Sequence, residues 1–349
     1  MSSDLGRLAA ASALLQRHLV IDGHNDAIVA HIRHGKRSLA RPQNGSPRHA
    51  GTISFAWEHE NLQPSGELQL DLPRMRQAGL DVAFFAVDVT SAFPNHLAYA
   101  LDGLGYLLGD IDGCADVRVI RCVADISAAR ERGAAGVLLA IEHADATARS
   151  LNVLRALYEL GVRSIGLTHN VSSWAADGCL QAREGVGLTS YGVALVQEMN
   201  RLGMVVDLAH VSPGAFAHAI EVSSRPVIFS HGNARALRDH PRNLTDGQLR
   251  ALARNGGVIG LSLVRFFVDD DQDKATVDRW VDHAVHVAEV AGIETLALGS
   301  DFDGGGMLLH DVTELPQLVD GLARRGYTED DISALLGGNM LRVLAATIG

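Results

Sequence analysis

Short, continuously apolar runs recur along the chain, and segments with helical spacing lie between most of them. The apolar residues are consecutive rather than alternating in eight runs: 18–22, 81–89, 136–142, 164–169, 204–210, 226–231, 257–263 and 295–301. Strands that are buried on both faces have this pattern, which is typical of parallel sheets covered by helices. The runs therefore predict eight parallel strands.

The segment 190–203 is an example of the helical pattern between these runs. Tyr191, Leu195, Met199 and Leu202 recur every three or four residues, and Gly203 follows the last of them. Apolar residues at this spacing form one face of an amphipathic helix, and glycine commonly ends a helix. Strands that alternate with helices eight times predict an α/β protein with a (β/α)8 barrel of the TIM type.

Two regions depart from this alternation. Residues 31–70 are rich in Gly, Pro, Ser and basic side chains, which predicts a long loop over one end of the barrel and a candidate lid. Residues 92–133 predict an extended, mostly helical connection, and residues 8–15 predict a surface helix. Because the sequence has no obvious linker or low-complexity tract, we expect residues 1–349 to form a single domain.

Composition narrows the classes of partner. The chain has 349 residues, 47% of them hydrophobic, and a formal net charge of −11. This acidic balance argues against a nucleic-acid-binding surface. No apolar run approaches the roughly 18 residues that cross a membrane. The N-terminal apolar stretch follows Asp4, ends at Arg17 and has no small-residue cleavage site after it, which favours a surface helix over a signal peptide. We therefore expect a soluble protein with a small molecule or a metal as its partner.

The three cysteines, Cys114, Cys122 and Cys179, lie far apart in the chain. Their spacing fits neither a zinc finger nor an even set of disulfides. Free thiols are typical of a reducing compartment, so we expect a cytoplasmic protein.

Side chains of the types that bind metals follow six of the eight predicted strands. They are His24, Asp26, Glu142, His169, His210, His231, Asp301 and Asp303. Each alone could be a hydrogen-bonded loop residue, and the aspartates of "SDFDGG" could form a turn. In a (β/α)8 barrel, however, the carboxyl ends of all strands meet at one rim, where active sites lie. Buried together, imidazoles and carboxylates would be poorly stabilised without a cation, so the set predicts a metal centre at this rim.

The ligand types indicate which metal the centre would hold. Imidazole and carboxylate without thiolate suit Zn²⁺, with Mn²⁺, Fe²⁺ and Co²⁺ as alternatives. One catalytic zinc uses about three protein ligands and a water, fewer than the sequence offers. Two divalent ions, roughly 3.5–4 Å apart and bridged by a carboxylate, fit the number of ligands.

Several stretches also resemble one known family. They are "DGHND" (22–26), "IGLTHN" (165–170), "GLTSYGVALVQEMNRLGMVVDLAHVS" (187–212), "PVIFSHGNARAL" (226–237), "HPRNLTD" (240–246), "LGSDFDGG" (298–305) and "GGNMLRVL" (337–344). In this order, and over nearly the whole chain, the sequence resembles the membrane (renal) dipeptidase family of the amidohydrolase superfamily.

The resemblance implies a ligand set for two metals. One metal would bind His24, Asp26 and Glu142. The second would bind His210 and His231 and share Glu142 as a bridge.

The resemblance also implies roles toward a substrate. His169 would contact the scissile carbonyl oxygen, Arg242 would bind the terminal carboxylate, and Asp301 would be the acid and base. The residues alone leave Arg242 open to another interpretation, a structural ion pair with Asp239 or Asp246. The implied reaction is hydrolysis of dipeptides, including L-Xaa-D-Xaa, by a metal-bridging hydroxide.

Other interpretations stay open at this point. The same metals could hydrolyse an N-acyl amino acid or a lactone, and a non-catalytic binding barrel is a more distant alternative. His143 stands where the family often has glycine, and the pocket residue around 264–267 is undefined. Both leave the preferred side chains open. A homodimer is compatible with the sequence.

Overall fold

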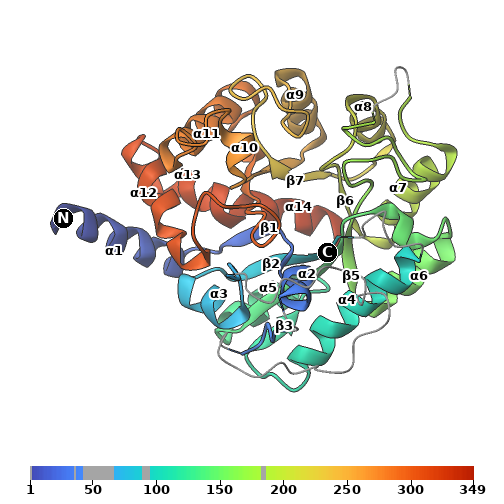
Figure 1. Cartoon of the computed structure of the whole chain (residues 1–349), viewed down its shortest axis with the longest axis horizontal. Coiled ribbons are helices and arrows are strands. Elements are labelled where there is room, and N and C mark those ends of the chain that lie inside the picture. Colours follow the sequence, from blue (N-terminus) through green and yellow to red (C-terminus); the bar gives the residue numbers. More distant parts are fainter. Residues whose placement is uncertain (1, 35–36, 42–66, 89–94, 182–185) are drawn as a thin grey trace.

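The strands form a closed parallel barrel at the centre of the molecule, with helices around it (Figure 1). The structure is a computed structural model that describes residues 2–34, 37–41, 67–88, 95–181 and 186–349. The predicted lid at 31–70 lies mostly outside these residues. The strands are β1 (Ile21–Asn25), β2 (Val82–Val87), β3 (Val117–Val119), β4 (Ala135–Ile141), β5 (Val162–Gly166), β6 (Val205–Asp207), β7 (Ile228–Gly232), β8 (Val258–Leu261) and β9 (Leu296–Leu298).

Eight of these strands close the barrel in the order β1-β2-β4-β5-β6-β7-β8-β9, and β9 pairs back to β1. All pairs are parallel, which confirms the predicted (β/α)8 fold. The ninth strand, β3, lies in the segment 92–133, for which the sequence predicts a mostly helical connection. It pairs only with the first residues of β4, where Val117 lies opposite Ala135. β3 has only three residues, and all of them are half-buried. The segment therefore has no long apolar run that would predict a barrel strand.

The helices surround this barrel. They are α1 (Ser2–Arg17), α2 (Ala27–Arg33), α3 (Leu72–Ala78), α4 (His96–Ile111), α5 (Val123–Glu131), α6 (Leu151–Leu160), α7 (Ser190–Leu202), α8 (Pro213–Val222), α9 (Asp246–Asn255), α10 (Arg265–Val268), α11 (Val277–Ala291), α12 (Pro316–Arg324), α13 (Glu329–Ser333) and α14 (Asn339–Thr347). The predicted helix 8–15 lies within α1, whose N-terminal end projects from the body of the molecule (Figure 1).

Helix α7 shows how local sequence sets an element. Thr189 accepts a hydrogen bond from the backbone N–H of Gly192, which satisfies a donor at the start of the helix. Leu195 and Met199 are buried, as the apolar spacing predicts. Gly203 ends the helix in the left-handed conformation, with φ of 79°.

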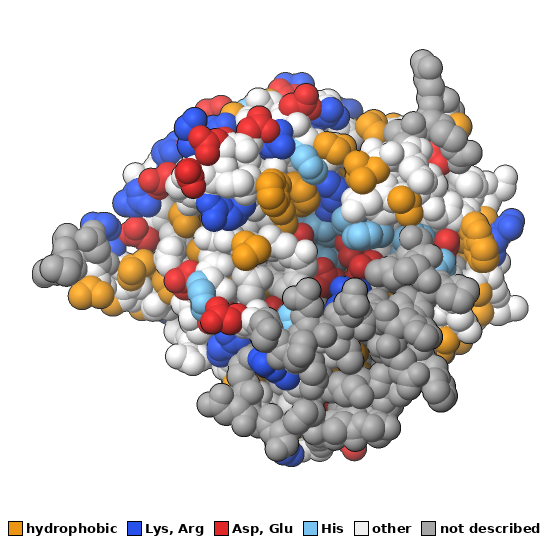
Figure 2. Space-filling model, viewed as in Figure 1, with side chains coloured by type: hydrophobic (Ala, Val, Ile, Leu, Met, Phe, Trp, Pro, Cys, Tyr) orange, Lys and Arg blue, Asp and Glu red, His pale blue; other side chains and the backbone are white. Residues whose placement is uncertain are grey.

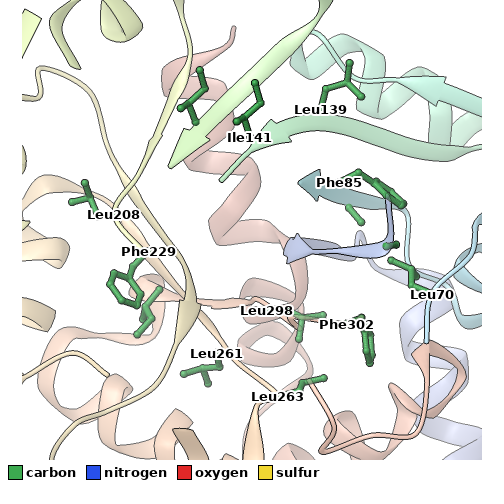
Figure 3. Packing of buried hydrophobic residues seen from close by; sticks show 14 of the residues in the cluster. Leu70, Phe85, Leu139, Ile141, Leu208, Phe229, Leu261, Leu263, Leu298 and Phe302 are labelled. Carbon is green, nitrogen blue, oxygen red and sulfur yellow. The ribbon is translucent and has the colours of Figure 1, made fainter. Parts of the chain in front are cut away.

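Two hydrophobic clusters follow from the alternation of side chains along the strands. The larger cluster contains Phe85, Leu139 and Leu298, and Figure 3 shows its members on strands around the barrel. The smaller cluster takes the alternate positions, such as Phe84 and Leu138, together with residues of α14. Because neighbouring residues of a strand point to opposite faces, strands such as β2, β4 and β8 contribute to both clusters.

Glycine brings three strands close together inside the barrel. A Cβ at Gly260 on β8 would lie 2.0 Å from the carbonyl oxygen of Ser230 on β7. A Cβ at Gly299, directly after β9, would lie 1.9 Å from the same oxygen. Side chains cannot occupy these two positions, so backbone fills this part of the interior.

Candidate active site at the carboxyl ends of the strands

The side chains predicted for the metal centre come together at one rim of the barrel. His24 lies on β1 and His231 on β7, while Glu142 directly follows β4 and His210 follows β6. Asp26 lies between β1 and α2. All of them are buried or nearly so, and none exceeds a side-chain exposure of 14%. Strand ends therefore bring into contact residues that lie up to about two hundred positions apart.

Glu142 is the centre of this group. Its Oε1 lies 2.8 Å from Nε2 of His210, 3.4 Å from Nε2 of His231 and 3.7 Å from Nε2 of His24. Within the described part of the chain, this oxygen nevertheless has no hydrogen-bond partner, because none of the three contacts has hydrogen-bond geometry. A buried carboxylate oxygen without a donor is costly, and a cation would stabilise it.

A second set of atoms adjoins the first. Nε2 of His24 lies 3.6 Å from Oδ2 of Asp26 and 4.0 Å from Oδ1 of Asp301. Three overlapping groups each have their ligand atoms within 4.8 Å of one another. They are His24, Glu142 and His231; Glu142, His169 and His210; and His24, Asp26 and Asp301. These donor sets fit divalent metal ions, since each combines imidazole with carboxylate.

The protonation states of the group also favour a cation. Burial raises the pKa of Glu142 well above its usual range. Burial and the neighbouring Arg242 guanidinium hold the pKa of His210 well below its usual range, and burial with the charge of His24 does the same for His231. His210 and His231 are thus in the neutral state that metal ligands need. Although burial lowers the pKa of His24, the charges of Glu142 and Asp26 raise it well above its usual range, so this imidazole, like Glu142, would lose its proton to a metal.

Asp301 is held in an unusual backbone conformation beside this group. Its φ is +58°, which is uncommon for a residue with a side chain. Its N–H donates to the carbonyl of His24, and its own carbonyl accepts from the N–H groups of 304–306. Burial raises the pKa of its carboxyl to about 7. These hydrogen bonds stabilise the strained conformation and point to a functional constraint.

Gly304 leaves room for two of the carboxylates. A Cβ at this position would lie 2.0 Å from Oδ2 of Asp26 and 2.3 Å from Oδ1 of Asp301. Any larger residue would displace at least one of these side chains.

A pocket of about 410 Å³ opens onto the group. Figure 2 shows histidine and acidic side chains in a hollow at the centre of this face, with hydrophobic side chains beside it. Besides the residues already described, the lining includes His169, Asn170, Leu180, His240, Arg242, Val264, Phe267 and Gly305. The pocket is large enough for a small molecule of two amino acids.

Arg242 lies at the pocket, eleven residues beyond His231 in sequence, and is only 3% exposed. Its Nη2 donates to Nε2 of His210 at 2.9 Å and to the carbonyl of His231 at 3.2 Å. Its Nε and Nη1 are buried and have no partner among the described residues. Two nitrogens of a buried guanidinium thus have N–H groups free to bind an anion such as a carboxylate.

The alternative interpretation of Arg242 as half of a structural ion pair is not supported. Asp239 pairs with Arg235 at 2.7 Å, and Asp246 pairs with His286 at 2.8 Å. Both candidate acids have other partners.

His169 lines the same pocket from the loop after β5. Its ring centre lies 4.4 Å from that of His210, and its Nδ1 is 3.9 Å from Oδ1 of Asp88. Burial lowers its pKa to about 4, so the imidazole is neutral near pH 7 and has one N–H to donate.

The whole chain also matches a known family. The sequence profile of the membrane dipeptidase family, peptidase family M19, matches residues 8–348. The chain belongs to the membrane dipeptidase family. It is accordingly a metal-dependent peptide hydrolase.

Relatives of this dipeptidase family member include both sequences and solved structures. An uncharacterised dipeptidase of Schizosaccharomyces pombe is 38% identical over 298 residues, which span 79% of this chain and 72% of the relative. The structure of a Rhodobacter sphaeroides metallopeptidase with a phosphinate mimic of L-Ala-D-Ala has a TM-score of 0.80 and 27% identity. The match covers 95% of this chain and 99% of the Rhodobacter sphaeroides protein. The M19 metallopeptidase dipeptidase AC has a TM-score of 0.81 and 28% identity over the same shares.

Two departures from the family pattern have different consequences. His143 is 3% exposed and does not line the pocket in the described part of the chain. Its Nδ1 instead accepts a hydrogen bond from the N–H of Asp145. Within 264–267, by contrast, Val264 and Phe267 do line the pocket. The departure that bears on which substrate side chains fit the pocket is therefore the region 264–267.

Sequence reasoning assigned no role to several residues that support the site. Asp22 is buried and accepts hydrogen bonds from the N–H and the hydroxyl of Ser300, which joins β1 to the segment that carries Asp301. The Ser230 hydroxyl lies 2.8 Å from Nδ1 of His231, and Asn170 contacts His210. All of these lie one or two positions from a predicted ligand or catalytic residue, which is the signal that could have identified them.

Among the described residues, no helix is both long enough and apolar enough to span a membrane. A homodimer, with which the sequence is compatible, and the expected cytoplasmic location stay predictions.

Proposed function

We propose that this chain hydrolyses dipeptides with a free terminal carboxylate, using two divalent cations, with Zn²⁺ as the expected metal. His24, Asp26 and Glu142 would hold one cation, and His210 and His231 would hold the other with Glu142 shared. The convergence of Nε2 atoms on the unpartnered Oε1 of Glu142 supports a shared carboxylate. When bound, such a pair acidifies a water molecule and polarises a carbonyl group.

The chain's own residues supply the remaining steps. Asp301, held beside His24, accepts the proton of the attacking water and delivers it to the leaving amine. His169 donates its N–H to the oxygen of the scissile carbonyl as negative charge develops there. Hydrolysis adds one water across the peptide bond, so the products are an acid and an amine.

The observation that carries the substrate class is the pair of free N–H groups on Arg242. An N–H of a buried guanidinium can bind a carboxylate oxygen through a charge-assisted hydrogen bond. Because Arg242 lies next to His210 and His231, a carboxylate bound there would lie close to the metal ligands. The closeness of Arg242 to the metal ligands fits a short substrate whose scissile bond is one residue from its carboxyl end. Both L and D configurations at the terminal residue are included in the proposal.

The decisive test compares a dipeptide with its C-terminal amide. Arg242→Ala should lower kcat/KM for the dipeptide by about 2–4 kcal/mol, roughly 30- to 1,000-fold, because one partner of a desolvated charge pair is lost. The amide lacks the charge and should lose far less. L-Ala-L-Ala and L-Ala-D-Ala, each with its amide, would also show the preferred stereochemistry.

Arg238→Ala is the matched control. Arg238 lies in the same loop, pairs with Asp270 and does not line the pocket. This variant should affect neither substrate specifically. An equal loss on dipeptide and amide in Arg242→Ala would refute the carboxylate clamp.

A further inference from the structure

The imidazole of His210 has partners on both of its nitrogens. Nε2 faces the group around Glu142 and lies 2.9 Å from Nη2 of Arg242. Nδ1 faces the other way and lies 2.9 Å from Oδ1 of Asn170. The chemistry of these two neighbours determines where the imidazole proton sits.

A guanidinium has only N–H groups, so Arg242 can only donate to His210. Nε2 must therefore carry a lone pair, and the proton of the neutral ring must be on Nδ1. Oδ1 of Asn170 is then the acceptor of that proton. The backbone N–H of Asn170 also points at Nδ1 from 3.3 Å, a longer contact than the 2.9 Å to Oδ1. The donor of Arg242 at Nε2 is what assigns the ring proton to Nδ1.

The side-chain amide of Asn170 is itself oriented by the segment 178–181. The thiol of Cys179 lies 3.6 Å from the same Oδ1 and can donate to it. Two donors converge on this atom, which identifies it as oxygen rather than nitrogen. The backbone adds two further contacts, because Leu180 N–H donates to Asn170 and Cys179 N–H donates to His210.

We propose that Asn170 is a positioning residue, whose oxygen holds His210 in the Nδ1–H form and so keeps the Nε2 lone pair for a divalent cation, which would replace the N–H of Arg242 at that atom. The inference rests on the proposed function, in which His210 binds a metal. Asn170 differs from the equivalent neighbour of His231, which is the Ser230 hydroxyl. A hydroxyl can donate or accept and fits either form of the ring, whereas an amide oxygen only accepts.

The test uses Co²⁺ as the probe, because its visible spectrum reports the ligands and geometry of the site. Metal-free protein would be titrated with Co²⁺, and affinity and spectrum would be recorded for wild type and two variants. Asn170→Leu has a similar size but no acceptor, and should lower the affinity by about 10- to 100-fold and alter the spectrum. Asn170→Asp keeps an acceptor oxygen, so its Co²⁺ affinity should stay within about threefold of wild type and its spectrum should be unchanged.

Asn200→Leu is the matched control for loss of a buried asparagine. Asn200 lies on α7, is 5% exposed, and accepts hydrogen bonds from Ser223 and Ser224, away from the metal ligands. This variant should bind Co²⁺ with the wild-type spectrum even where its melting temperature falls. If Asn170→Leu does not fold, Asn170→Ala carries the same expectation.

The outcomes separate this inference from the proposed function. A wild-type protein that binds no Co²⁺ refutes the metal centre itself. A wild type that binds, with Asn170→Leu binding equally well and with the same spectrum, refutes the role of Asn170 alone. Equal losses in the Leu and Asp variants would also refute it, because they would show that the acceptor oxygen is not what matters.

Discussion

Glu142 at the rim of the barrel and Glu198 on α7 are both buried glutamates, 4% and 8% exposed, yet their surroundings are opposite. Glu198 accepts hydrogen bonds from Arg155 and Arg201, and those from Arg201 are the main reason that its pKa falls to about 2. Glu142 faces three imidazoles and has an oxygen without a donor, and burial raises its pKa.

The difference shows what each carboxylate requires. The charge of Glu198 is stabilised by cations that the chain itself provides. The charge of Glu142 has no such donors, because Nη2 of the nearby Arg242 donates to His210 and His231 instead. The charge of His24 favours the ionised carboxylate, but His24 is itself a predicted metal ligand. A buried charge left in this condition requires a cation from outside the chain.

The largest effect should follow from Glu142→Gln. The amide cannot bridge two cations, so the variant should bind less metal than the nearly two equivalents expected for wild type. Its kcat/KM should fall beyond the roughly 10²–10⁴-fold that one acid–base group contributes. Glu198→Gln is the control and should keep both metal and activity. Elemental analysis and dipeptide hydrolysis measure the two effects, and a Glu142→Gln protein with full metal content would invalidate the contrast.

A smaller loss should follow from Asp301→Asn, which separates binding a metal from moving a proton. Asp301 lies beside His24, but its proposed role is to carry a proton rather than to bridge cations. The variant should keep most of its metal and lose at least about 10²-fold in kcat, the lower end for acid–base catalysis. Near-normal turnover in metal-loaded Asp301→Asn would assign the proton transfer elsewhere.

The smallest effect should follow from Glu198→Gln, and it concerns stability alone. The pKa of Glu198 is about 2 in the folded protein and 4.5 in its unperturbed state. A lowered pKa stabilises the fold above about pH 4.5, and this contribution is lost as the pH falls toward 2. Because Arg155 and Arg201 are largely exposed, the variant should melt only a few degrees below wild type at pH 7.

Melting curves between pH 7 and pH 3 measure this last effect. The difference in melting temperature between Glu198→Gln and wild type should shrink as the pH is lowered. A difference that stays constant with pH would mean that Glu198 contributes through packing rather than through its charge.

The fold could be predicted largely from sequence because the barrel strands are continuous apolar runs. The ends of the strands could not. The run 204–210 predicts a strand through His210, whereas β6 ends at Asp207 and His210 has φ of +66°. The chain turns there so that the imidazole reaches Glu142, and apolar patterning does not report such a turn.

The candidate ligands could be predicted from their positions after strands, since barrel geometry alone brings those ends together. The contact between Arg242 and His210 depends instead on the path of the loop after β7, where Ala234 pairs with Leu244. The role of Asn170 likewise depends on how 178–181 folds back. Such contacts are set by tertiary structure and have no periodic signal in the sequence.

The close approach of β7, β8 and β9 at Gly260 and Gly299 limits how this enzyme could be engineered. Around the Ser230 carbonyl, Gly260 and Gly299 pack by their backbone, so these two positions offer no side chain to trim or exchange. A library randomised at these two positions would yield mostly misfolded protein. Changes in substrate preference have to come from the side chains that line the pocket. Leu180, Val264 and Phe267 are three of these, and they can be exchanged without moving a strand.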